Sequence, residues 1–190
     1  GIYATHKDNE IISQLLGKGP GLILDMPCGT GRFIELAKEK DFNVVAADYS
    51  PTMLDVAKQH EGVKFIQADV FDPPFENEIF DAILMSRLLF HYERSDKIIL
   101  SLLPSLKSGG RMIFDTLNTF SSRWLASQII CTFNRDPGIR LYFERPKFFE
   151  KKLEAMGLRV IQKKSAYILP TRAYRYLPSM VGSVSDIIEK

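Results

Sequence analysis

The chain has 190 residues, of which 45% are hydrophobic and 25% are charged, and its formal net charge is +2. This composition is ordinary for a globular protein and gives no reason for a second domain, so we treat residues 1–190 as a single domain. So small a net charge does not by itself favour nucleic acid or an anionic membrane as a partner. Two scattered cysteines, Cys28 and Cys131, make no disulfide framework, which favours a reducing compartment and predicts a cytoplasmic location. No apolar run reaches the roughly 18 residues of a membrane span.

Apolar runs and helical patterns alternate along the chain, after a start at Gly1 that indicates a cut or tagged fragment. We expect strands at 22–25, 43–48, 63–70, 79–86, 111–116 and 158–168. Helices are expected over 8–16, from a glycine loop to Lys40, from Ser50 onward, over 95–107 and over 146–156. Six strands in βα alternation imply a parallel sheet with right-handed crossovers and helices on both faces.

The turn between the first strand and its helix carries the strongest functional signal. Gly29 and Gly31 allow the backbone to approach a ligand closely, and Asp25 ends the strand where open α/β sheets bind their ligands. A dinucleotide fold would have a third glycine where this chain has Ile34. A phosphate-binding loop would continue with Lys and Ser or Thr, whereas Gly31 is followed by Arg32. We therefore reject both of these nucleotide sites.

Two more acids accompany the next apolar runs, Asp48 at the end of the second strand and Asp69 in the third. This ordered series of acids, with Gly-x-Gly in the loop, resembles the class I S-adenosylmethionine-dependent methyltransferases. The resemblance implies that the loop wraps the amino-acid end of the cofactor, that Asp48 binds both ribose hydroxyls and that Asp69 contacts the adenine amino group. Pro27 stands where the family has its first loop glycine, and it fixes φ and removes one backbone donor.

The resemblance covers residues 22 to 168 and implies a Rossmann-like, doubly wound α/β fold, with a mainly parallel sheet of six or seven strands and helices on both faces. Tyr49 and Met53 would lie against the adenine, although Met53 fits a plain core position equally well. The implied cofactor is S-adenosylmethionine, and the product is S-adenosylhomocysteine. The implied cofactor-binding residues are Asp25, Cys28, Gly29, Gly31, Asp48, Tyr49, Met53, Asp69, Val70 and Ser86.

The C-terminal part departs from the family's pattern, which usually closes with an antiparallel seventh strand. Residues 171–190 contain two prolines and a helical pattern over 184–190, which predicts that the last strand is missing or replaced. The quartet Asp72-Pro-Pro-Phe75 resembles the motif of enzymes that methylate amino groups of nucleic acids. It precedes the fourth strand instead of following it, so we interpret it as a loop.

The methyl acceptor would approach the carboxyl ends of the fourth and fifth strands. His91 follows one strand and Asp115 ends the other, so both are candidates for a general base, which is needed only if the acceptor enters protonated. A histidine beside Phe90 also fits a buried, hydrogen-bonded wall residue. The irregular, aromatic segment 119–146 is predicted to be a substrate-shaping cap. Its apolar residues and arginines suggest a small acceptor with an apolar body and an anionic group, while an RNA base or a protein side chain stays open.

Together these residues fit an enzyme that moves a methyl group from sulfonium to a nucleophile by direct in-line displacement. Such an enzyme mainly aligns the reactants, and alignment can supply roughly 7–11 kcal/mol of the barrier. The alternatives are a module that binds the cofactor without turnover, and a nicotinamide oxidoreductase. His6 and His60 lack other ligand residues at suitable spacing, so no metal is predicted. The sequence indicates no oligomeric state.

Overall fold

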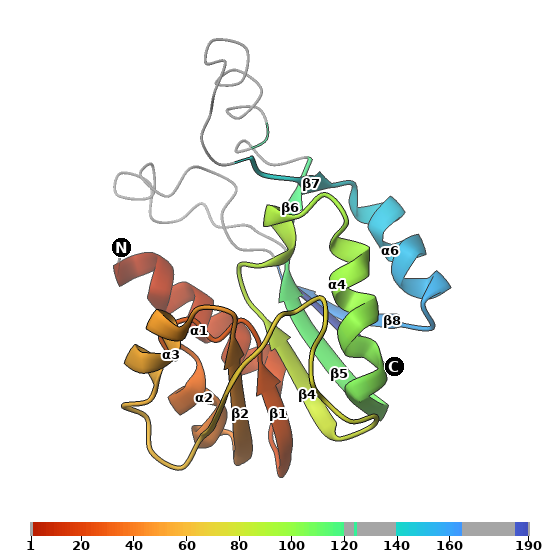
Figure 1. Ribbon diagram of the computed structural model, residues 1–190. Helices are drawn as coiled ribbons and strands as arrows, with labels where there is room; N and C mark the ends of the chain where they lie inside the picture. Colours follow the sequence, from red (N-terminus) through yellow and green to blue (C-terminus); the bar gives the residue numbers. More distant parts are fainter. Residues whose placement is uncertain (1, 120–123, 125–139, 165–184, 190) are drawn as a thin grey trace.

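The structure is a computed structural model that describes residues 2–119, 124, 140–164 and 185–189. The strands of its main sheet are β1 Gly21–Asp25, β2 Phe42–Asp48, β3 Lys64–Gln67, β4 Phe80–Met85, β5 Leu106–Asp115, β8 Arg159–Lys164 and β9 Ser185–Glu189. These seven strands lie in the order β3-β2-β1-β4-β5-β9-β8 (Figure 1). The pairs among β1 to β5 are parallel, while β9 is antiparallel to both of its neighbours. The predicted doubly wound α/β fold is confirmed.

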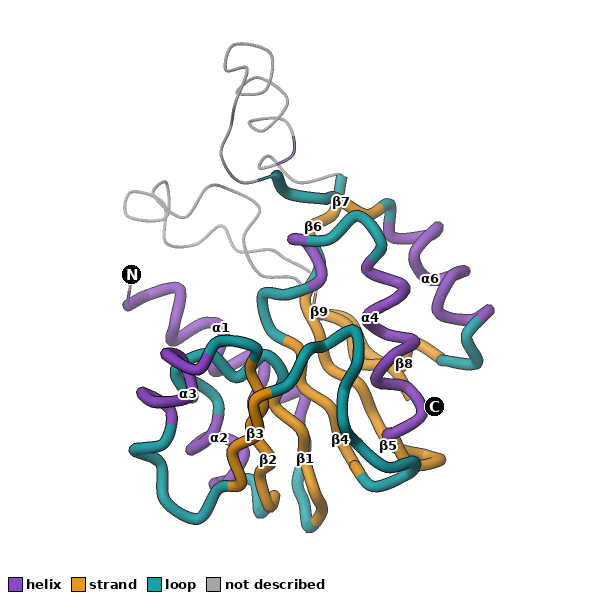
Figure 2. The backbone as a smooth tube through the Cα atoms, in the orientation of Figure 1, coloured by secondary structure: helices purple, strands orange, loops and turns teal. Residues whose placement is uncertain are grey.

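Helices cover both faces of the sheet (Figure 2). On one face lie α1 Ile2–Leu16, α2 Ile34–Glu39 and α3 Pro51–Ala57, and on the other α4 Ser95–Leu102 and α6 Pro146–Ala155. Two short 3-10 helices are η1 Leu89–His91 and η2 Leu103–Ser105. Each layer buries an apolar stripe, with Leu15 and Ile34 against one face and Ile98 and Phe149 against the other. Of the helices described, none is both long and apolar enough to cross a membrane.

The predicted helix start at Ser50 is confirmed by its cap. The Ser50 Oγ accepts a hydrogen bond from the Met53 N–H at 3.4 Å, and Pro51 takes the first helical position, where its missing N–H costs nothing. The Asp72–Phe75 quartet is a loop, as expected, and Phe75 packs edge-on against Phe80. A cavity of about 320 Å³ lies below this loop, between apolar side chains at the amino-terminal parts of β1, β2 and β3.

The helical pattern expected over 184–190 is wrong, because Ser185–Glu189 form strand β9. Five residues with two adjacent isoleucines satisfy a helical period as well as a strand, so periodicity alone cannot decide between them. Pairing with a distant strand decides: Ile187 lies opposite Ile113, and Ile188 lies opposite Met112. The seventh strand is therefore present, and the prediction that it is missing or replaced fails as well.

A second, two-stranded sheet forms the base of the predicted cap. Its strands β6 Leu117–Asn118 and β7 Phe143–Glu144 pair in parallel, and the Thr119 N–H donates to the Glu144 carbonyl at 3.1 Å. The two ends of segment 119–146 are thereby held together. Residues 120–123 and 125–139 lie outside the described residues, so the cap itself stays a prediction.

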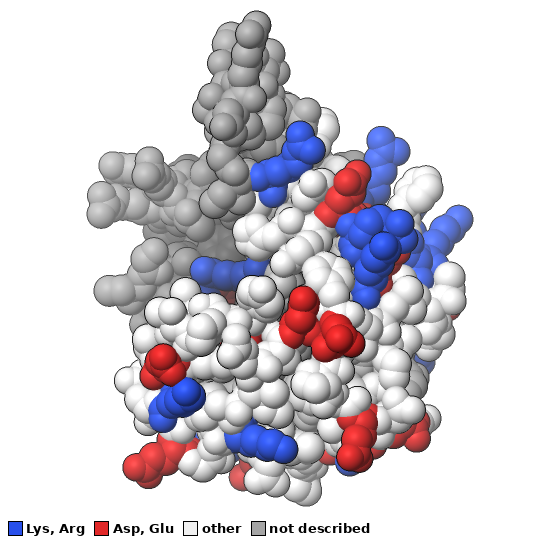
Figure 3. All heavy atoms as spheres, viewed as in Figure 1, with Lys and Arg blue, Asp and Glu red and all other residues white. Residues whose placement is uncertain are grey.

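Charged side chains of both signs are interspersed over the face shown in Figure 3, with lysines and arginines gathered mainly over α4 and α6. This distribution agrees with the formal net charge of +2. It gives the described part of that face no broad field of a single sign.

Candidate functional site

The predicted acids gather at one edge of the sheet. Asp25 ends β1, Asp48 ends β2 and Asp115 ends β5, while Ser86 directly follows β4. Asp69 lies two residues beyond β3 on the same edge. The strand order reverses between β1 and β4, and open α/β sheets bind their ligands at such a switch point. The 320 Å³ cavity lies toward the opposite edge of the sheet and is not part of this cluster.

The glycine loop joins β1 to α2 with two residues in a left-handed conformation. The φ angle is 55° at Gly29 and 86° at Gly31, values that other residues rarely adopt. A Cβ atom at Gly31 would lie 2.7 Å from Cδ2 of His60, whereas at Gly29 it would meet nothing within 4 Å. The Cys28 N–H fastens the loop to β2 by donating to the Ala47 carbonyl at 2.9 Å. Gly31 is therefore also required by packing, while Gly29 borders open space.

Asp48 holds the loop and the start of α3 in place. Its side chain is buried, Oδ2 accepts from the Gly29 N–H at 2.8 Å, and Oδ1 accepts from the Ser50 N–H at 2.8 Å. Each carboxylate oxygen can accept a second hydrogen bond. The residue predicted to bind ribose hydroxyls is thus fixed by two backbone amides and keeps capacity for a ligand.

Asp25 is the most unusual group of the site. It is 2% exposed, and neither carboxylate oxygen has a hydrogen-bond partner within the described structure. Burial raises the pKa of Asp25 to about 8, the charge of Asp48 adds to the rise, and Arg32 opposes it. Burial beside the two acids also raises the pKa of the Cys28 thiol to about 12, so Cys28 is a neutral packing residue and not a nucleophile.

On the β2 and β3 side, two large side chains stand in solvent. Tyr49 is 72% exposed and Met53 is 43% exposed, while Val70 is buried. The open alternative that Met53 is a plain core residue is therefore wrong. Asp69 is exposed, and its Oδ1 accepts from the Phe71 N–H at 2.9 Å. This side offers apolar surface with one carboxylate nearby.

On the β4 and β5 side, the backbone N–H of Arg87 donates to Oδ1 of Asp115 at 2.6 Å. This contact holds Arg87 in a left-handed conformation, with φ of 58°. Burial raises the pKa of Asp115 to about 6; the Arg87 amide opposes the rise, and the charge of Asp8 adds to it. His91 is exposed on η1, next to the Phe90 ring at a centroid distance of 4.6 Å. The interpretation of His91 as a buried wall residue is wrong.

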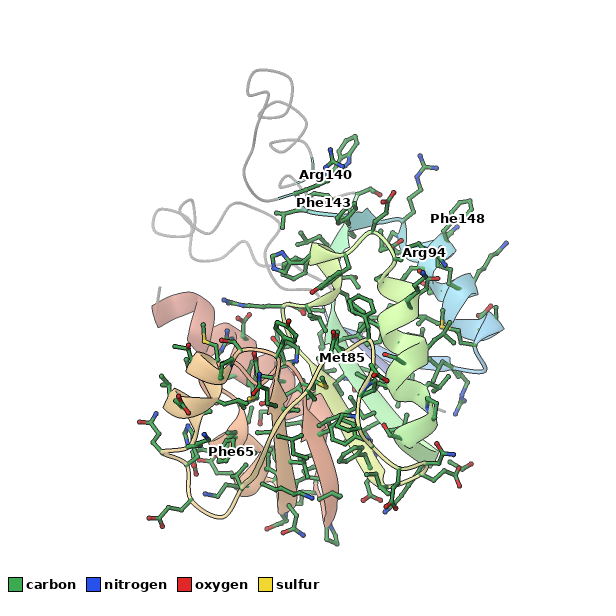
Figure 4. The ribbon with its side chains drawn as sticks, in the orientation of Figure 1. Phe65, Met85, Arg94, Arg140, Phe143 and Phe148 are labelled. Carbon is green, nitrogen blue, oxygen red and sulfur yellow. The ribbon has the colours of Figure 1, made fainter. Side chains whose placement is uncertain are left out.

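Asp8, Arg32 and Arg87 also join the site, although no sequence pattern singled them out. Oδ2 of Asp8, on α1, accepts from Nη2 of Arg32 at 2.5 Å and from Nη2 of Arg87 at 2.9 Å. Helix α1 thereby forms a wall at the carboxyl ends of β4 and β5. A small cavity of about 20 Å³ lies there, and its lining residues are Asp8, Ile11, Ile12, Met85, Ser86 and Asp115. Figure 4 shows Met85 in the interior, well below Phe143 and Arg140 at the base of the predicted cap.

Comparison with known proteins agrees with this geometry. A family model described as a methyltransferase domain matches residues 24–114. The chain is 36% identical over 101 residues to the demethylmenaquinone methyltransferase of Clavibacter sepedonicus, a match that covers 51% of this chain and 41% of the relative. It is 30% identical over 119 residues to the malonyl-[acyl-carrier protein] O-methyltransferase of Serratia marcescens, which covers 60% of this chain and 47% of the relative. The chain spans about half the length of these two relatives.

Solved structures share the fold over almost the whole chain. An S-adenosylmethionine-dependent methyltransferase from Mesorhizobium loti has a TM-score of 0.70 at 16% identity, over 97% of this chain and 96% of that one. The magnesium protoporphyrin IX methyltransferase of Synechocystis, with bound S-adenosylhomocysteine, has a TM-score of 0.71 at 18% identity, over 99% and 83%. The chain belongs to the class I S-adenosylmethionine-dependent methyltransferases. The nicotinamide oxidoreductase alternative is therefore dropped.

The residues of this methyltransferase fit S-adenosylmethionine. The buried Asp25 carboxyl lacks a partner and would be satisfied by a cationic group of a ligand. The Asp48 oxygens keep acceptor capacity for hydroxyls, and the space beside Gly29 lets a ligand approach the loop backbone. The exposed Tyr49 ring offers a surface for an aromatic base. Within the described ranges, no three His, Cys, Asp or Glu side chains are grouped as a metal site requires.

Proposed function

We propose that this methyltransferase moves the methyl group of S-adenosylmethionine to a small-molecule acceptor by direct in-line displacement. The observation that carries the proposal is that two halves of a site adjoin. Asp25, Asp48 and the glycine loop form one half at β1 and β2, and Arg87 with Asp115 forms the other at β4 and β5. The names of the two relatives, which specify a demethylmenaquinone and a malonyl-[acyl-carrier protein], support an acceptor whose reacting group is small.

In this proposal the chain acts mainly by binding and alignment. Bound S-adenosylmethionine supplies a methyl group that its positive sulfur has already activated. The chain orients it from fixed points, because Asp48 is held by two backbone amides and Asp25 is buried in the sheet edge. Alignment of this kind can supply roughly 7–11 kcal/mol of the barrier, so neither a covalent intermediate nor a metal is needed. We place the reaction in the cytoplasm, on the argument from the unpaired cysteines; Cys28 is a free thiol.

Asp115 is the better placed of the two candidate bases. Its Oδ1 is taken by the Arg87 amide, and Oδ2 remains to accept a proton. With a pKa of about 6, most Asp115 carboxyls are ionised at pH 7 and available as a base. His91 is exposed at the side of the predicted cap and stays the second candidate. Either would act only on an acceptor that enters protonated, such as a phenol or an alcohol.

A transfer assay with methyl-tritiated S-adenosylmethionine tests this function against its alternatives. The purified chain is offered four separate pools, namely hydroquinones and phenols, malonyl thioesters, total RNA and protein extract. We expect label in one of the first two pools, strong loss of label with Asp48→Asn, and none with the matched control Asp55→Asn, an exposed acid on α3 paired with Lys58. Label in RNA or protein would overturn the small-molecule acceptor. Cofactor binding by calorimetry without transfer to any pool would favour a non-catalytic binding module.

A further inference from the structure

Unsatisfied polar atoms of the molecule concentrate at the start of the glycine loop. In the part of the chain that the structure describes, four buried side-chain nitrogen or oxygen atoms lack a hydrogen-bond partner. Three of these atoms belong to two residues, as both carboxylate oxygens of Asp25 and Nε of Arg32. A buried donor or acceptor without a partner is costly and rare, so three of them at one ligand-binding edge call for a missing partner.

The two residues carry opposite charges but do not pair with each other. Arg32 opposes the rise in the pKa of Asp25, which places its charge near that carboxyl. The ion pair of Arg32 that the structure describes is instead with Asp8, at 2.5 Å. A carboxyl and a guanidinium that attract without touching leave their free edges to a third group. A group that satisfies both must carry a cation for Asp25 and an anion for Arg32.

The orientation of the Arg32 guanidinium is fixed on its other sides. Nη2 donates to Oδ2 of Asp8, and the guanidinium carbon lies 4.6 Å from the centre of the Phe33 ring. A planar guanidinium held by one edge and one face presents its remaining donors in a set direction. Nε–H is therefore a pre-oriented donor, and Asp8 is the positioning residue that sets it.

We propose that Arg32 and Asp25 together recognise the zwitterionic amino-acid end of the cofactor, with Arg32 Nε–H donating to the ligand carboxylate and Asp25 accepting from the ligand ammonium. This rests on the proposed function, because it takes the ligand to be S-adenosylmethionine or S-adenosylhomocysteine. Arg32 is then a specificity-determining residue. Its consequence is that the site discriminates against an otherwise identical ligand without the carboxylate.

Titration calorimetry with two ligands tests the proposal. The probes are S-adenosylhomocysteine and its decarboxylated analogue, each titrated into the wild type and into Arg32→Gln. A hydrogen bond between charged groups corresponds to roughly a 10- to 150-fold change in affinity, so the wild type should prefer the intact ligand by this factor. In Arg32→Gln the preference should fall below about threefold, through weaker binding of the intact ligand alone. Undiminished preference in Arg32→Gln would overturn the proposal.

Two further variants separate recognition from a structural role. Arg32→Lys keeps a cation for Asp8 but has no Nε–H, so it too should lose the preference; retention of the wild-type preference would count against Nε as the donor. Asp8→Asn should weaken binding of the intact ligand more than that of the analogue, because it loosens Arg32. The matched control is Arg111→Gln, since Arg111 contacts the Leu16 carbonyl away from the site, and both affinities should be unchanged. If folded wild type binds neither ligand, the proposed function itself fails.

Discussion

Ligand binding should release a proton from Asp25. The free carboxyl has a pKa of about 8 and is therefore mostly neutral at pH 7, whereas a ligand ammonium favours its ionised form. Each pH unit below 8 then costs binding about 1.4 kcal/mol, or about tenfold in affinity. Between pH 6 and pH 7.5, where the ligand ammonium stays charged, the affinity of the wild type for S-adenosylhomocysteine should rise roughly 25-fold.

Asp25→Asn removes this proton release while it preserves the shape of the side chain. Its affinity should be flat over the same pH range and lower than that of the wild type at pH 7.5. Because the wild type loses part of its advantage in ionising Asp25, the difference at pH 7.5 should be near the lower end of the 1.5–3 kcal/mol that a hydrogen bond to a charged group contributes. Calorimetry at pH 7 in buffers of different ionisation enthalpy measures the protons released, about one for the wild type and none for Asp25→Asn.

The same substitution should stabilise the ligand-free protein. The folded-state pKa of about 8 lies above the reference value of 3.8, so the folded state holds a proton that the unfolded state releases. This stability is fully present below pH 4 and is lost as pH rises toward 8. Urea unfolding at pH 7 should show Asp25→Asn more stable by up to about 4 kcal/mol. A wild type with pH-independent affinity, no proton release and no stabilisation by Asp25→Asn would refute the reasoning.

Four other predictions concern the remaining parts of the site. Asp48→Asn should weaken S-adenosylhomocysteine binding by roughly 1.5–3 kcal/mol, and calorimetry that finds unchanged affinity in a folded variant would remove the ribose assignment. Gly31→Ala should lower the free energy of unfolding in urea by about 1–3 kcal/mol, because its Cβ would lie 2.7 Å from the His60 ring; equal stability would contradict this packing. If Asp115 is the base, single-turnover transfer by the wild type should fall as pH drops through about 6, and Asp115→Asn should be slower by roughly 10²–10⁴ at unchanged cofactor affinity. Hydrogen exchange in 119–146 should slow when cofactor and acceptor are both bound, and no change would argue against a cap.

The part of the site that could be predicted from the sequence is the part written in contiguous residues. A strand, its terminal acid and the following turn are neighbours in the chain, so Asp25, Gly29 and Asp48 could be located from pattern alone. Parallel strands then bring their carboxyl ends to one edge without further information. The same logic identified Asp115 as a residue near the acceptor side.

What the sequence could not predict depends on contacts between distant residues. Asp8 and Arg87 are 79 positions apart, and neither residue type nor spacing signals that one carboxylate holds two arginines. The wrong interpretations of Met53 and His91 have a related cause, because exposure depends on what packs over a side chain and periodicity reports only which face it occupies. The unpaired state of Asp25 is likewise visible only once its surroundings are known.

The place of β9 affects the order in which this sheet can be completed during synthesis. Among the described strands β9 is the last in the chain, yet it lies between β5 and β8, both made earlier. While the ribosome has not yet released residues 185–189, β5 has an open edge, and β8 has no partner through which to join the sheet. An open edge of this kind can pair with a strand of another chain. The nascent chain is therefore most exposed to mispairing just before its final strand emerges, and a chaperone that covers β5 at that stage would raise the yield of folded protein.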